Sequence, residues 1–119
     1  MLRATAGGVT SAAADAKYAL LGTVKNVTPT TGQTVAFDNA PQDQVLWITP
    51  AGTLASLTIT LPSESASRLG QRAVIATNQA ITSSTVTGAT TILNAVSNFS
   101  PNDCFAFIKV AANTWILLQ

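Results

Sequence analysis

The stretch that decides the fold is Ser56-Leu57-Thr58-Ile59-Thr60-Leu61-Pro62. Its apolar residues alternate with Ser and Thr, so that the apolar side chains fall on one face of an extended chain and the hydroxyls on the other. This alternation is typical of a half-buried β-strand. The strand ends at Pro62, because proline has no backbone N–H to donate to a neighbouring strand. The chain around this stretch therefore belongs to a β-rich domain.

Segments of similar amino-acid composition lie on both sides of this stretch. Short segments rich in Val, Ile, Thr and aromatic residues are separated by Gly, Pro, Asn and Asp, a pattern that predicts strands joined by turns. The nine expected strands are residues 23–28, 33–38, 45–49, 56–61, 72–77, 84–87, 90–96, 103–110 and 114–118. Nine short strands favour an all-β domain over residues 23–119, built as an antiparallel β-sandwich or jelly roll.

Residues 1–22 are expected to form an N-terminal arm. Residues 1–10 are small and patternless, so they cannot bury enough apolar surface to offset the entropy lost on ordering. Residues 11–21 favour a short helix, because Ser11 can cap free amides, alanines follow, and Gly22 suits the left-handed stop position. The apolar residues expected to contact a partner are Leu2, Val9, Tyr18, Leu20 and Leu21.

The composition holds more apolar surface than a small domain easily hides. Charged residues make up 9% of the 119 residues, against about 25% in an ordinary soluble domain, and 47% are hydrophobic. Three expected strands, within 45–48, 105–110 and 115–118, are apolar on both faces, and such strands are covered on both sides. The cover is either the rest of a three-layered or tightly rolled chain, or another subunit.

Burial by another subunit is the alternative that we favour. Fully burying one Leu, Ile or Phe side chain contributes about 1.5–3 kcal/mol, so an exposed row of them would promote aggregation. We therefore expect a homo-oligomer. The residues expected to pack the core and the subunit contacts are Trp47, Phe105, Phe107 and Trp115.

Most catalytic chemistry is excluded by residue types. The chain has no histidine and a single glutamate, which leaves no Ser-His-Asp triad, no imidazole metal site and no general base that titrates near neutral pH. Glu64 is expected in a solvated loop. Asp38, Asn39 and Asp43 lack the spacing of a calcium loop and are expected to form turns. We expect no enzymatic activity, no cofactor and no metal.

Charge and cysteine content limit the partners further. The six basic residues are scattered, so no nucleic-acid partner is expected, and no stretch approaches the roughly 20 apolar residues that cross a membrane. Arg68 and Arg72 are either exposed and solvated or bind a carboxylate of a neighbouring chain. Cys104 is expected to act as a small hydrophobe in a strand. No secretory signal pattern is present, which predicts synthesis in a reducing cytoplasm.

Four segments in a fixed order resemble known proteins: residues 50–62, Gly70-Gln71-Arg72, a Thr/Val strand that ends at Gly88, and residues 111–115. Together they resemble small β-rich virion proteins of tailed bacteriophages, over roughly residues 45–119. These proteins include capsid decoration (cement) proteins and the terminal domains of tail-fibre-like proteins.

The resemblance implies a sandwich or jelly-roll subunit that assembles, commonly as a trimer, on the outside of a particle. It implies a capsid decoration protein that contacts the major capsid protein on the virion surface and stabilises capsomer contacts. The alternative is a tail-fibre or receptor-binding module that recognises a host glycan.

Overall fold

The computed structural model describes residues 22–118. This part of the chain is all-β and contains no helix. Its strands are β1 (Thr23–Val27), β2 (Thr34–Ala36), β3 (Gln44–Ile48), β4 (Leu57–Thr60), β5 (Arg72–Thr77), β6 (Ser84–Thr87), β7 (Thr91–Leu93), β8 (Cys104–Ala111) and β9 (Thr114–Leu117). Each lies within a few residues of its sequence prediction. The helix expected over residues 11–21 lies outside the described residues.

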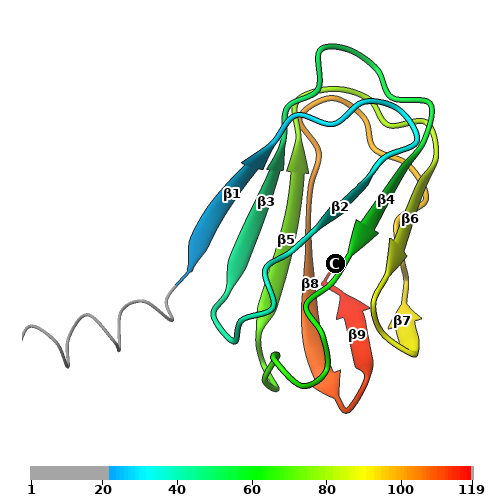
Figure 1. The fold of residues 1–119 in the computed structure, drawn as a ribbon. Coiled ribbons are helices and arrows are strands. Elements are labelled where there is room, and N and C mark those ends of the chain that lie inside the picture. Colours follow the sequence, from blue (N-terminus) through cyan, green and yellow to red (C-terminus); the bar gives the residue numbers. More distant parts are fainter. Residues whose placement is uncertain (1–21, 119) are drawn as a thin grey trace, which may run out of the picture.

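The strands form two facing sheets, and the chain crosses between them (Figure 1). Sheet A has the order β1-β3-β5-β8-β9-β7, and sheet B has the order β2-β4-β6. The first six strands alternate between the sheets, so that β1 with β2, β3 with β4, and β5 with β6 each form one coil of the chain. Three coils stacked in this way give a solenoid-like arrangement.

The expected antiparallel sandwich or jelly roll is wrong. Each strand of a coil pairs in parallel with the equivalent strand of the next coil, as β3 does with both β1 and β5, and β4 does with both β2 and β6. Only the pairs β5–β8 and β8–β9 are antiparallel, and β7 pairs with β9 in parallel. The physical reason is that each turn carries the chain to the facing sheet instead of back along the strand it has just left.

The two ends of the stack differ. At the C-terminal end, β8 covers the edge of β5, and Ser84 and Ile81 form backbone hydrogen bonds with Ser97 and Phe99 beside β6. At the N-terminal end, β1 and β2 are the outermost described strands of their sheets. Lys25 joins these two strands, because its Nζ lies 3.1 Å from Ala36 O on β2 and 3.1 Å from Asp38 Oδ1.

The core fills the space between the sheets. Its members come from inward positions of both sheets and from the segments that connect them. They are Phe37, Leu46, Ile48, Leu54, Leu57, Ile59, Leu61, Ala73, Ile75, Ile81, Phe99, Phe107 and Trp115. The strand that decided the sequence prediction, β4, contributes Leu57 and Ile59 inward and turns Thr58 and Thr60 outward, as its alternation predicted.

The turn after β6 requires glycine. Gly88 has φ +102°, and a Cβ atom added there would lie 2.9 Å from both Leu61 N and Leu61 O. We expect Gly88→Ala to lower the free energy of unfolding by about 1–3 kcal/mol, the cost of a strained backbone conformation. Gly52→Ala is the matched control, because nothing lies within 4 Å of its added Cβ. Urea unfolding measures both; equal stabilities of the two variants would contradict this explanation of the turn.

Candidate interaction face

Most outward side chains in the middle of sheet A are apolar. Parallel register places outward side chains of neighbouring strands beside one another in rows. The first row is Asn26, Trp47, Ala76 and Cys104. The second is Val24, Val45, Val74, Ala106 and Leu118. The third is Arg72, Ile108, Ile116 and Leu93. These residues are called the sheet A face below.

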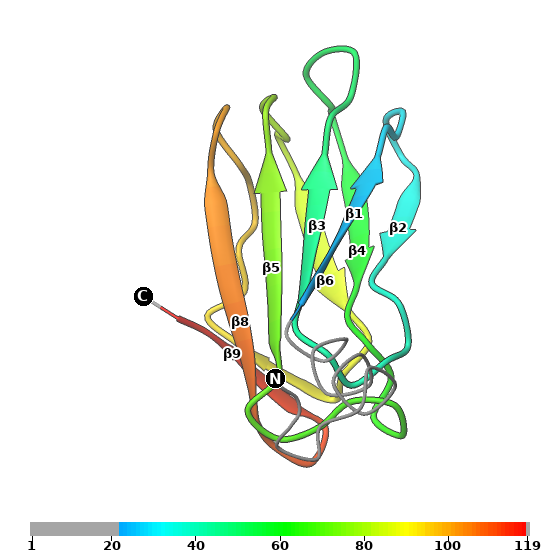
Figure 2. The same ribbon diagram turned by 90° about the vertical axis from the view of Figure 1, so that its left-hand side faces the viewer.

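Within residues 22–118, no strand packs on this face. Figure 2 views the molecule from this side, with β3, β5 and β8 side by side and sheet B behind them. Val24 is 70% exposed, and Leu93 and Leu118 are also exposed. The described residues therefore supply no third layer, which was one of the two covers considered for the doubly apolar strands.

The outer face of sheet B has a different chemistry. Parallel register there aligns Thr34, Thr58 and Thr85 in one row, and Ala36, Thr60 and Thr87 in the next. The hydroxyls of Thr60 and Thr87 lie 3.3 Å apart. Hydroxyl side chains are readily solvated, so this face needs no cover. The contrast between the faces makes the sheet A face the candidate for contact with another molecule.

The four residues predicted for core and subunit packing divide between the two sides of sheet A. Phe107 and Trp115 are buried in the core. Phe105 points inward too and meets Phe99 edge to face, with ring centroids 5.3 Å apart. Trp47 alone points outward, into the sheet A face. Sequence reasoning did not single out Val74 and Ala76 of β5, although this strand is also apolar on both faces.

Other predicted contact residues lie elsewhere. Leu2, Val9, Tyr18, Leu20 and Leu21 are outside the described residues. Cys104 begins β8 as expected of a strand residue, but its side chain is exposed on the sheet A face. The prediction of a strand residue is confirmed, and β8 turns Cys104 outward among the apolar side chains of this face.

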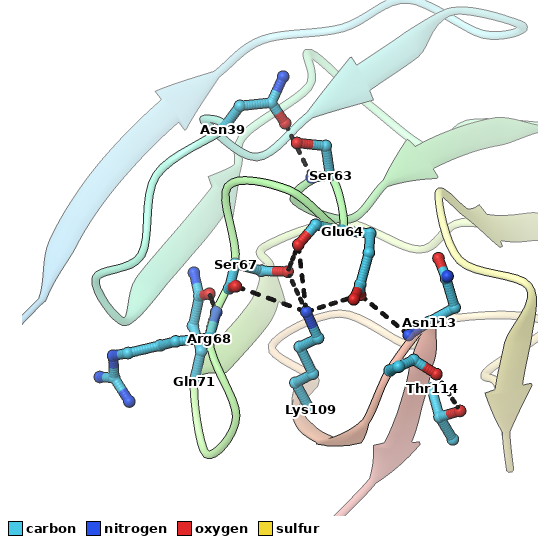
Figure 3. Close-up of polar contacts among 10 residues, drawn as sticks. Asn39, Ser63, Glu64, Ser67, Arg68, Gln71, Lys109, Asn113 and Thr114 are labelled. Atoms are coloured by element: carbon cyan, nitrogen blue, oxygen red, sulfur yellow. Dashed lines mark hydrogen bonds and ion pairs between the residues drawn. The ribbon is translucent and has the colours of Figure 1, made fainter.

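A polar cluster holds the connection between β4 and β5 against the β8–β9 hairpin (Figure 3). Lys109, with 3% of its side chain exposed, places Nζ 2.7 Å from Glu64 Oε1 and 2.7 Å from Ser67 Oγ. It also donates to Glu64 O at 3.3 Å. Asn113 N donates to Glu64 Oε1 at 2.9 Å. Glu64 lies in a loop and is exposed, as predicted, and it is also the ion-pair partner of a buried lysine.

The same cluster shows what Ser67 and Lys109 can do chemically. A serine hydroxyl beside a lysine resembles a nucleophile with its base. Here the ammonium donates to Glu64 Oε1, Glu64 O and Ser67 Oγ, so it has no lone pair with which to accept the Ser67 proton. The arrangement acts as a clamp between two segments of the fold.

Residues of the Gly70-Gln71-Arg72 segment have structural roles beside this clamp. Gln71 is buried, and its Nε2 donates to Ala40 O and Gln42 O, each at 2.8 Å. Gly70 N donates to Lys109 O at 2.8 Å. The two Gln71 bonds tie the loop before β3 to the segment that leads into β5. The Gly70 bond ties that same segment to β8.

The acidic residues considered for metal binding have protein partners. Asp38 pairs with Lys25, and Asp43 accepts from Arg68 at 3.3 Å and from Arg72 N at 2.9 Å. Arg68 thus binds a carboxylate of its own chain. Residues 22–118 contain no cluster of three or more potential metal ligands from His, Cys, Asp and Glu. No helix in this part of the chain is long and apolar enough to span a membrane.

Comparison of the chain with protein-family models, with curated proteins and with solved structures gave no match.

The clamp makes stability depend on pH. The hydrogen bond from Lys109, followed by that from Asn113 N, lowers the pKa of Glu64 below its ordinary value of 4.5. A carboxyl group whose pKa is lower in the folded state contributes stability above its ordinary pKa, and loses that contribution as the pH falls through the folded pKa. Glu64→Gln should therefore lower Tm at pH 7, and its deficit relative to the parent should shrink as the pH falls below 4.5.

Thermal unfolding between pH 7 and pH 3, at about half-unit steps, measures this deficit. Asp38→Asn is the control, since it removes an ion pair in which both side chains are exposed, and such pairs contribute about 0–1 kcal/mol. A Glu64→Gln deficit that stays constant over the whole range would show that the ion pair is not its cause.

Proposed function

We propose that this chain is a structural protein of a tailed-bacteriophage virion, specifically a capsid decoration (cement) protein. It assembles as a homo-oligomer on the outer shell, where it contacts the major capsid protein and stabilises contacts between capsomers. The observation that carries the proposal is the sheet A face, an apolar surface that no described element covers. An exposed apolar face on a small protein marks a contact with another molecule.

Two further features support an architectural and non-enzymatic role. The polar cluster at Lys109 is engaged in holding the fold, as its bonds to Glu64 and Ser67 show. The resemblance of residues 50–62 and 70–72 to phage virion proteins, which commonly form trimers, favours three copies around a local symmetry axis. Three copies attach to a shell multivalently, so that weak individual contacts sum to a high avidity.

Within this proposal, the N-terminal arm reaches from each subunit to the shell. Its contact residues would be Leu2, Val9, Tyr18, Leu20 and Leu21. Assembly takes place in the host cytoplasm and ends on the capsid surface, with neither nucleic acid nor membrane as a partner.

One observation favours a second candidate, a tail-fibre or receptor-binding module that recognises a host glycan. The coils stack in parallel, and β1 and β2 are the outermost strands of the stack among residues 22–118. Further coils can extend such a stack, as in elongated solenoid proteins.

The number of copies per particle distinguishes the two candidates. Quantitative mass spectrometry of purified particles, with the major capsid protein as internal reference, should give hundreds of copies for a decoration protein. A tail module would be present in only a few copies, and that result would contradict the decoration proposal.

The arm is tested separately in the full-length chain. Replacing both Leu20 and Leu21 with Asp should abolish binding to undecorated shells in a co-sedimentation assay, because charged residues cannot enter an apolar contact without a large desolvation cost. The oligomer should persist. Thr10→Asp is a control within the same segment. Undiminished binding by the Leu20/Leu21 variant would refute the role of the arm.

A further inference from the structure

The sheet A face carries one large aromatic side chain beside several small ones. Trp47, the largest outward side chain, stands in a row whose next two members along the sheet are Ala76 and Cys104. Ala106 lies beside Cys104 in the neighbouring row. The small side chains leave a shallow step one to two strands from the tryptophan, which corresponds to about 5–10 Å at the usual strand spacing.

The face is nearly free of charge. Its only charged residue is Arg72, at the border row, and Asn26 is the only other polar member. Nucleic acids and anionic lipid surfaces bind through clusters of basic residues, so one arginine is a poor match to them. The matching surface is another apolar and neutral one.

Within residues 22–118, the chain offers one such outer surface. The outer face of sheet B consists largely of threonines, and the Lys25–Asp38 ion pair lies at the end of the stack formed by β1 and β2. The sheet A face is therefore complementary to itself in polarity, and its small side chains at Ala76 and Cys104 leave room for a tryptophan from another copy.

We propose that the sheet A face is covered by the same face of a second copy of this chain, with Trp47 of one copy packed over Ala76 and Cys104 of the other. This deepens the proposed function, on whose self-association it rests, by naming the surface through which the copies meet. The contact forms a symmetric pair, or closes a ring when each copy gives its tryptophan to the next.

The size of the face sets the strength of the contact. Six strands at about 4.8 Å spacing and five residues at about 3.3 Å rise give a flat area of about 400 Å² per copy. Two copies together offer about 800 Å², not counting the additional area of side chains that protrude from the flat face. Stable interfaces bury about 1,200–2,000 Å². Association through this face alone is accordingly reversible and depends on protein concentration.

A matched pair of substitutions tests the proposal. Val74 and Thr58 both point outward and are half-buried, each on an inner strand of its sheet, but they lie on opposite sheets. We expect sedimentation velocity to give an oligomer for the parent chain and for Thr58→Lys, and a 12.2 kDa monomer for Val74→Lys. A parent chain that stays monomeric at every concentration, or a Val74→Lys variant that assembles like the parent, would overturn the proposal.

A second measurement needs no substitution and decides the matter if Val74→Lys fails to fold. Cys104 is one of the small side chains of the sheet A face, is the only cysteine, and is exposed in the single chain. Its alkylation by a maleimide should slow about tenfold when about nine-tenths of the copies are assembled, because only the unassembled fraction reacts. A labelling rate that does not change with protein concentration contradicts the proposal.

Protection of Cys104 in a monomer would contradict it as well, since the chain's own N-terminal arm would then be the cover. These outcomes are separable from the proposed function. Copies that assemble through the sheet A face but do not bind shells would leave this interface standing and remove the decoration role.

Discussion

The parallel register between consecutive coils is the constraint on which the rest of the structure depends. It aligns inward residues such as Leu46 and Ile75 into the core and, in the same step, aligns Val45 with Val74 on the outer face. A shift of one residue would exchange the two sets of side chains. Here both sets are apolar in β3 and β5, so the register that builds the core also builds a second apolar surface on the outside.

The positions of the strands could be predicted from the sequence because their signal is local. Alternation in Leu57-Thr58-Ile59-Thr60 is contained within one strand. Pairing is not local: the step from Thr23 to its partner Gln44 is 21 residues, whereas the step from Gln44 to Ala73 is 29 residues. No constant repeat marks the coils, and connections such as residues 28–33 are short enough to suit hairpins. The sequence therefore favoured antiparallel pairing, which the structure contradicts.

The candidate sites, too, could be predicted where the signal lies within one strand and could not where it depends on contacts between residues far apart in the chain. Doubly apolar strands signalled an outward apolar surface, and Trp47 lies on that surface. The clamp at Lys109 was missed because Glu64 lies 45 residues away in the chain. One signal was available, since Lys109 is in phase with Phe105 and Phe107 and its side chain must therefore enter the interior. A buried ammonium requires a partner, which limits the charged candidates to the five acidic residues of the chain.

The two tryptophans allow the central claim, that a second copy covers the sheet A face, to be tested in the unmodified protein. Trp115 is 1% exposed and stays shielded from a soluble quencher, whereas Trp47 points outward. Acrylamide quenching of the tryptophan fluorescence, followed over a wide range of protein concentrations, therefore reports on Trp47. We expect a quenchable component in dilute solution that disappears as the copies associate; quenching that is identical at all concentrations would contradict the claim.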